Sequence, residues 1–180
     1  MIDLWVEFVK SLWLLFPMYA ANGFPPLAKG KIPIDLNKKF YDGNRILGDG
    51  KTFEGFSLGL IAGFLVGALE TYLYPSLNAY AMEYNAELPY MDLKVAFLLS
   101  FGALFGDIVS SFLKRRFGLP RGADVPLLDQ WNFVIGALFF SFLFTNVTVW
   151  MVLIMLLITP LIHRIANIIA HKIKVKKEPW

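Results

Sequence analysis

The sequence contains no cysteine and has few charged residues for its length. The absence of cysteine excludes thiol catalysis and cysteine-ligated zinc. Charged residues make up 17% of the 180 residues, whereas a soluble domain usually has about 25%. Hydrophobic residues make up 57%, and the mean hydropathy is +0.55. Because the hydrophobic residues are concentrated in long runs, the composition indicates a protein of the lipid bilayer.

Five hydrophobic segments are candidate membrane spans, since a helix needs about 20 apolar residues to cross about 30 Å of hydrocarbon. They lie at about residues 4–21, 55–74, 93–113, 127–144 and 147–170. The first resembles a signal peptide in length, but Asp3 and Glu7 stand where a basic segment would be expected. The fourth is short, and little chain separates it from the fifth. We therefore predict an all-α integral membrane protein with five transmembrane helices, forming a single membrane domain over residues 1–180.

Lysine and arginine gather in three segments: the loop 22–54, the loop 114–130, and the end of the last span with the basic tail 171–180. Lys10 and Lys94 lie on the other side, where acidic residues dominate. By the positive-inside rule, both loops and the C-terminus are expected to be cytoplasmic and the N-terminus outside. Any chemical site should then lie on the cytoplasmic face.

The stretch GDGKTFEG, residues 48–55, looks like the end of a nucleotide-binding P-loop but lacks the rest of it. A Walker A loop requires a glycine where this chain has Arg45, and the following helix is a membrane span. Two interpretations stay open. The glycines and Lys51 could form an anion-binding turn at the N-terminus of the second span. Alternatively, Thr52 is simply the N-cap of that helix.

The third predicted span carries an acid within the membrane. Ionisable side chains at that depth are costly, so they face protein or water and often carry function. A spacing of i, i+3, i+4 and i+7 puts four polar residues on one helix face: Asp107, Ser110, Ser111 and Lys114. Gly102 and Gly106 allow another helix to approach closely. The alternative is a polar seam that only joins helices, although the seam ends in three consecutive basic residues.

Both predicted cytoplasmic loops add basic and acidic groups. They could be ordinary turns and topology-setting charges. Taken together, however, basic groups can neutralise phosphates, and a few carboxylates can hold Mg²⁺ with substrate phosphates. A site at the border of the hydrocarbon suits a substrate with a phosphate head and a lipid tail. The expected chemistry is displacement at phosphorus, with metal and basic groups stabilising the charge.

Several motifs together resemble a known family. They are, in chain order, NGFPP at 22–26, GDGKT at 48–52, GDIVSSFLKRR at 106–116, Arg121-Gly122, and PLLDQ at 126–130. Their order and spacing, over most of residues 20–136, resemble the CDP-diglyceride synthetases (phosphatidate cytidylyltransferases). The resemblance is closer to the small archaeal branch of that family, the CDP-archaeol synthases.

The resemblance implies a Mg²⁺-dependent cytidylyltransferase of the cell membrane. CTP and an isoprenoid ether lipid phosphate, 2,3-bis-O-geranylgeranyl-sn-glycerol 1-phosphate, would give a CDP-lipid and pyrophosphate. No nucleic acid is expected as a partner, and a homodimer is allowed. The expected catalytic residues are Asp107, Lys114, Arg115 and Lys51, and the expected metal ligands are Asp107 and Asp129. The expected binding residues are Asn22, Pro25, Asn44, Asp49, Gly50, Thr52, Ser110, Ser111, Arg116, Arg121 and Asp124.

The chain also departs from the broad family pattern. Gln130 and Asn132 stand where that pattern has an arginine and a second acid after Asp129. The second metal ligand could then come from Asp124 or Asp49.

Two other classes of function remain as alternatives. An anion or nucleotide carrier would need a polar path through the whole bilayer, but the extracellular halves of the spans are apolar. A non-catalytic assembly protein could use the row Gly59, Gly63 and Gly67 as its interface. If the protein is an enzyme, the same row would pack helices within the bundle or in a dimer. His163 is expected to be a packing residue and not a catalyst.

Overall fold

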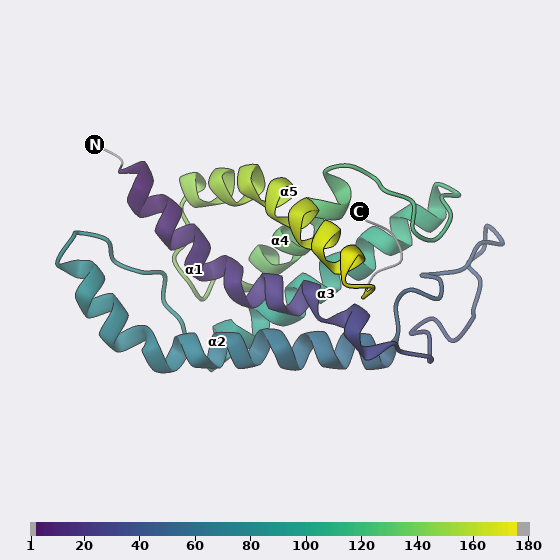
Figure 1. The fold of residues 1–180 in the computed structure, drawn as a ribbon, viewed down its shortest axis with the longest axis horizontal. Coiled ribbons are helices and arrows are strands. Elements are labelled where there is room, and N and C mark those ends of the chain that lie inside the picture. The colour runs from purple at the N-terminus through teal and green to yellow at the C-terminus, as the bar shows by residue number, and fades with distance from the viewer. Residues whose placement is uncertain (1–2, 176–180) are drawn as a thin grey trace.

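The computed structural model describes residues 3–175, which form a bundle of helices (Figure 1). The helices are α1 (Leu4–Gly23), α2 (Phe53–Met82), α3 (Leu93–Arg116), α4 (Leu128–Ser141) and α5 (Val149–Lys172), with a short 3-10 helix η1 (Pro25–Ala28) after α1. Across these residues there is no β-strand, only isolated bridges at Pro33–Thr52 and Lys39–Arg45. The all-α prediction is confirmed. The last part of the predicted basic tail, residues 176–180, lies outside the described residues.

Four of the described helical segments are long and apolar enough to cross a membrane: Leu4–Ala28, Phe53–Met82, Leu93–Arg116 and Val149–Lys172. They correspond to four of the five predicted spans. The remaining one, the fourth predicted span, corresponds to α4. This helix has 14 residues and is about 21 Å long at 1.5 Å per residue, which is less than the hydrocarbon thickness. The multi-pass character is therefore supported, while the count of five spans stays a prediction.

The four long helices α1, α2, α3 and α5 each begin at a side chain that caps their free backbone N–H groups. Asp3, Thr52, Asp92 and Thr148 each accept hydrogen bonds from the first turn of the helix that follows. The interpretation of Thr52 as an N-cap is thus confirmed: its Oγ1 accepts from Gly55 N at 3.1 Å. This cap also sets where the GDGKT stretch stops and α2 starts.

Rows of glycine bring the helices into close contact. A Cβ on Gly59 would lie 2.5 Å from Ala21 O of α1, and one on Gly67 would lie 2.5 Å from Ala96 Cβ of α3. The row on α2 therefore packs inside the bundle of one chain, as the enzyme hypothesis predicts. On α3, a Cβ on Gly106 would lie 2.0 Å from the carbonyl oxygen of Asn132 in α4. The predicted close approach to another helix is confirmed, and α4 is that helix.

The core lies in the middle of the bundle, and the polar loops lie at one end. Fully buried side chains from α1, α3, α4 and α5 form the core, among them Leu14, Met18, Leu99, Phe133 and Met155. His163 packs against Phe133, with ring centroids 6.3 Å apart, as expected of a packing residue. Figure 1 shows the loop between η1 and α2 and the loop between α3 and α4 at the same end. The start of α2 and the end of α3 are therefore brought together there.

Candidate active site

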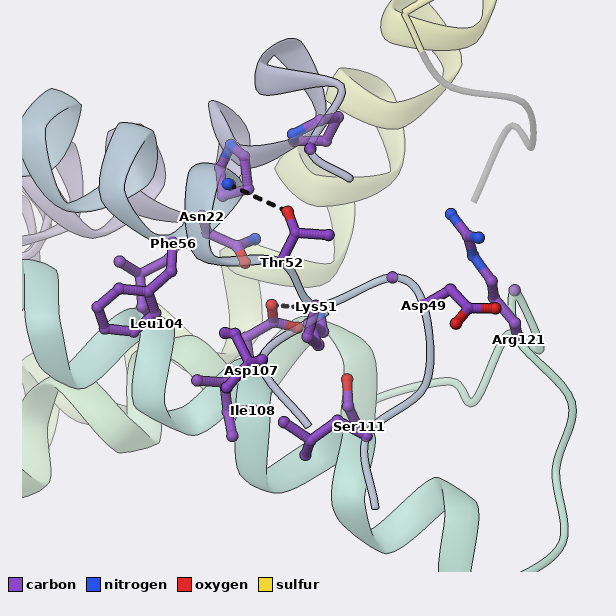
Figure 2. A pocket seen from close by; sticks show the side chains of 18 of the residues that line it. Asn22, Asp49, Lys51, Thr52, Phe56, Leu104, Asp107, Ile108, Ser111 and Arg121 are labelled. Atoms are coloured by element: carbon purple, nitrogen blue, oxygen red, sulfur yellow. Dashed lines mark hydrogen bonds and ion pairs between the residues drawn. The ribbon is translucent and has the colours of Figure 1, made fainter. Parts of the chain in front are cut away.

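A cavity of about 690 Å³ opens at the loop end of the bundle (Figure 2). The end of α1, the start of α2, the C-terminal half of α3 and both loops contribute to it. The predicted site residues in its lining are Asn22, Pro25, Asp49, Gly50, Lys51, Thr52, Asp107, Ser111, Lys114, Arg115 and Arg121. Segments that are far apart in the sequence are thus assembled around one space.

The centre of the cavity is an ion pair between the first loop and α3. Lys51 Nζ donates a hydrogen bond to Asp107 Oδ2. Both side chains keep about a quarter of their surface accessible, at 25% for Lys51 and 23% for Asp107. Both groups can therefore reach a ligand in the cavity.

A second ion pair joins the C-terminal part of α3 to the first turn of α4. Lys114 Nζ lies 2.7 Å from Asp129 Oδ1 and 3.3 Å from the carbonyl oxygen of Ala123. The other carboxylate oxygen of Asp129 accepts from Val125 N at 3.0 Å. Lys114 lines the cavity, but Asp129 is not among the lining residues. In this arrangement Asp129 orients Lys114.

Positive charge exceeds negative charge around the cavity. The basic lining residues are Lys29, Lys51, Lys114, Arg115 and Arg121, and the acidic ones are Asp49 and Asp107. The first turn of α2 adds the positive end of a helix dipole. One side of the cavity is apolar, with Phe56, Leu104 and Ile108, and Asp49 and Arg121 lie on the opposite side (Figure 2). Such a cavity suits an anion that carries an apolar group.

A smaller hollow of about 290 Å³ adjoins the cavity and shares Asp49, Arg115 and Arg121 with it. Asn44, a predicted binding residue, lines only this hollow. Its side-chain amide donates to Asp42 Oδ2 at 3.2 Å. Asn44 therefore lies beside the cavity and not in it.

Three further predicted binding residues lie outside both spaces. Ser110 is buried, and its hydroxyl has no hydrogen-bond partner within the described chain. Arg116 donates to Asp42 Oδ1 at 2.7 Å and not toward the cavity. Asp124 accepts from Arg164 Nη1 of α5 at 3.0 Å. Ser110 was predicted from the periodicity of α3, but its side chain is buried in the bundle. Arg116 was expected from the family resemblance, and its side chain contacts the first loop.

Asp35 was not identified from the sequence. Its fully buried carboxylate accepts hydrogen bonds from Arg45, from Leu47 N at 3.0 Å and from Gly48 N at 2.9 Å. Burial would raise the pKa of Asp35, but these hydrogen bonds outweigh it and hold the pKa well below its usual range. The only sequence signal is an acid between Ile34 and Leu36 in a basic loop. That signal is too weak to identify a partner ten positions later in the sequence.

The lining can supply ligands for Mg²⁺ together with a phosphate. Within residues 3–175, no three His, Asp or Glu side chains lie close enough to hold a metal by themselves. The lining does present the carboxylates of Asp49 and Asp107, and oxygens of Asn22 and Ser111. Mg²⁺ usually binds through one or two carboxylates, waters and substrate phosphates. This donor set therefore fits a metal that binds together with a phosphate ligand.

The helical bundle and its basic cavity define a multi-pass membrane protein with a site for a phosphorylated, partly apolar ligand. A family model, described as CarS-like CDP-archaeol synthase, matches residues 1–180. The chain belongs to this family, as the motif resemblance indicated.

Curated relatives and a solved structure agree with this assignment. The chain is similar to the CDP-archaeol synthase of Pyrococcus horikoshii, with 45% identity over 174 residues, covering 97% of this chain and 98% of that one. It is 47% identical over 170 residues to that of Thermococcus gammatolerans, covering 94% and 95% of the two chains. A solved structure, described as an intramembrane enzyme for archaeal membrane lipids biosynthesis, has 34% identity and a TM-score of 0.74, covering 89% of this chain and 94% of that chain.

Proposed function

We propose that the protein transfers CMP from CTP to 2,3-bis-O-geranylgeranyl-sn-glycerol 1-phosphate, giving a CDP-lipid and pyrophosphate. The observation that carries this proposal is the cavity itself. It gathers five basic side chains and Asp107 next to the apolar Phe56, Leu104 and Ile108. Family membership favours this enzyme over a carrier or a non-catalytic assembly protein.

The reaction is a displacement at the α-phosphorus of CTP. A phosphate oxygen of the lipid forms the new bond to that phosphorus, and the bond to the bridging oxygen of the β-phosphate breaks. The leaving group is pyrophosphate, which takes the bonding electron pair. Lys51, Lys114 and Arg115 stand where they can neutralise the charge that accumulates on the phosphoryl oxygens. The two phosphates repel each other, so this neutralisation also lets them approach.

We propose Mg²⁺ as the metal cofactor, with Asp107 as its protein ligand. A bound Mg²⁺ would polarise the phosphoryl group and neutralise the triphosphate. With Asp107 holding the metal in place of its ion pair with Lys51, Lys51 would be available to a phosphate oxygen. Asp49 is the other carboxylate of the lining and is the candidate for a second ligand.

The protein is expected to lie in the cell membrane with both loops in the cytoplasm, where CTP is available. The support is that the two basic loops lie at the same end of the bundle (Figure 1). In this arrangement α4 and the residues after it make the fourth crossing, which is the shortest of the five. Because the chain has no cysteine, Lys38→Cys and Glu87→Cys can each carry a single thiol label. An impermeant maleimide should label Glu87→Cys in intact cells and Lys38→Cys only after lysis; the reverse pattern would invert the topology.

The activity is tested with purified protein in detergent, α-³²P-labelled CTP, Mg²⁺ and the geranylgeranyl ether lipid phosphate. Label should move into the lipid phase, and chelation of the metal should stop it. A parallel reaction with a diacyl lipid phosphate measures the preference for ether lipids. If CTP binds but no label moves with either lipid, the cavity is a nucleotide-binding surface with another purpose. If CTP does not bind, a carrier becomes the better explanation.

A further inference from the structure

The two halves of the cavity come from separate parts of the chain, so specific contacts must hold them in their relative position. Lys51 belongs to a long loop whose only β-type pairings are two isolated bridges. Asp107, Ser111 and Lys114 belong to the rigid helix α3. A loop with so little regular structure does not by itself hold a lysine at a fixed distance from a helix.

Asp35 provides the first of these contacts, within the loop. Its carboxylate receives Arg45 Nε at 3.1 Å on one oxygen and Arg45 Nη2 at 2.6 Å on the other. It also receives the backbone N–H groups of Leu47 and Gly48. Such charge-assisted bonds are the stronger hydrogen bonds, particularly when they are bidentate and buried. The backbone from Arg45 to Gly48 is therefore wrapped around one buried charge.

Arg45 provides the second contact, because it connects the buried carboxylate of Asp35 to the lining of the cavity. Its Nη1 lies 2.8 Å from Asp49 Oδ1, and Asp49 precedes Gly50 and Lys51 in the lining. The side chain of Asp35 thereby determines where the GDGKT stretch begins.

Arg116 provides the third contact, which joins the loop to α3. Its Nη1 lies 2.7 Å from Asp42 Oδ1, and its Nη2 donates to the carbonyl oxygen of Arg45. Its guanidinium also lies over two rings, 4.6 Å from the centroid of Phe40 and 4.9 Å from that of Phe112. Arg116 is on the last turn of the helix that carries Asp107, so it ties the loop to that helix at a fixed place.

We propose that Asp35 and Arg116, acting through Arg45, are positioning residues that set Lys51 against Asp107 for the transfer reaction. This inference rests on the proposed cytidylyl transfer. Neither Asp35 nor Arg116 lines the cavity or the adjoining hollow, so neither has to touch the substrate. Arg116, expected from the sequence to be a binding residue, acts on the loop instead. A displacement of about 1 Å at a reacting group can cost on the order of 100-fold in rate, so a small shift of the loop is enough.

The variants Asp35→Asn and Arg116→Lys test the proposal. Asp35→Asn removes the charge that holds the guanidinium, and Arg116→Lys keeps the charge but removes the planar fork. Each should lower kcat/KM for CTP by about tenfold or more, as loss of a reacting geometry does. Arg164→Lys is the matched control, because that arginine also has an ion pair, with Asp124, and lies outside both spaces. It should transfer label at the wild-type rate.

A double-mutant cycle separates positioning from a general loss of folded protein. If Arg116 acts through Lys51, then Arg116→Lys should cause no further loss of the residual rate in a Lys51→Ala background. If the losses in the two backgrounds multiply, or if Arg116→Lys and Asp35→Asn transfer label normally, the proposal is wrong. If the wild-type protein itself transfers no label, the proposed function fails and this inference fails with it, whereas an active wild type with unaffected variants overturns this inference alone.

Discussion

Lys51 and Asp107 are 56 positions apart in the sequence, yet they form an ion pair inside the cavity. One belongs to a loop and the other to a membrane helix. Each group is the nearest opposite charge for the other as long as no ligand is bound. A nucleotide with its metal would offer each group a new partner, phosphate for the lysine and Mg²⁺ for the carboxylate. The pair therefore defines where the predicted chemistry should be tested first.

Lys51→Ala and Lys114→Ala should each abolish most turnover while leaving the protein folded. Both lysines line the cavity, and removing one donor to a developing oxyanion costs about 10²–10³ in kcat in well-studied enzymes. The measurement is transfer of label from CTP to lipid, with size-exclusion chromatography to check folding. Lys38→Ala, which removes an exposed lysine from the same loop, is the control. Normal rates in both cavity variants would rule out a shared site.

Asp107→Asn should remove Mg²⁺-dependent turnover without weakening the binding of CTP in the absence of metal. The carboxylate competes with phosphate for Lys51, so its neutralisation leaves the ammonium group free for the nucleotide. Binding of labelled CTP with and without chelator, next to the transfer assay, measures both effects. Full activity in this variant would mean that Asp107 serves only to join helices.

Asp129→Asn distinguishes a metal ligand from a residue that orients Lys114. Both carboxylate oxygens of Asp129 already accept hydrogen bonds, from Lys114 and from the backbone of Val125. We therefore expect a lower rate with an unchanged Mg²⁺ concentration at half-maximal activity. A magnesium titration of the variant gives the answer. A large increase in the Mg²⁺ requirement would instead support the sequence-based expectation that Asp129 binds the metal.

Gly106→Ala should destabilise the bundle. Its Cβ would lie 2.0 Å from the carbonyl oxygen of Asn132, and backbone at such a contact can move only if α3 and α4 separate. Overpacking of this kind typically costs about 1–3 kcal/mol. Thermal unfolding in detergent should show a lower midpoint. Gly23→Ala is the control, because a Cβ there meets no atom within 4 Å; equal midpoints for the two variants would contradict the close helix contact.

The first loop should lose stability in acid because of Asp35. Its pKa is lowered in the folded protein, while an unfolded aspartate titrates near about 3.9. The folded state therefore binds this proton less tightly than the unfolded state. The stabilisation is fully present above about pH 4 and is lost as the pH falls below that value toward the lowered pKa. Thermal unfolding between pH 6 and pH 3 should show a smaller decrease for Asp35→Asn than for the wild type; equal decreases would exclude this carboxylate as the cause.

Much of the site was visible in the sequence because its groups stand out against an apolar background. Asp107 and Lys114 share a helix face by simple periodicity, and both line the cavity. The GDGKT stretch was expected either to bind an anion or to cap a helix. It does place Lys51 in the cavity, and Thr52 caps α2. These features depend on local spacing, which a sequence shows directly.

The sequence was less informative about residues whose neighbours come from elsewhere in the chain. Ser110 lies on the expected part of α3, but the row Gly102 and Gly106 brings α4 against that side, so the hydroxyl is buried. The fourth predicted span became a helix of 14 residues packed closely on α3. Hydropathy reports that a segment is apolar, but it does not distinguish contact with lipid from contact with another helix.

The sequence by itself determined the class of this protein, which is a bundle of apolar helices with basic loops. Its motifs, in a fixed order, also indicated the family. It did so because the length of an apolar run and the periodicity of a helix depend on residues that are close together in the sequence. Only the tertiary structure decided which charges meet. The ion pair of Lys51 with Asp107, and the path from Asp35 through Arg45 to Arg116, join distant segments. Such partners are chosen by the packing of helices and the course of a loop, and the energy of a charge depends on the burial that this packing creates.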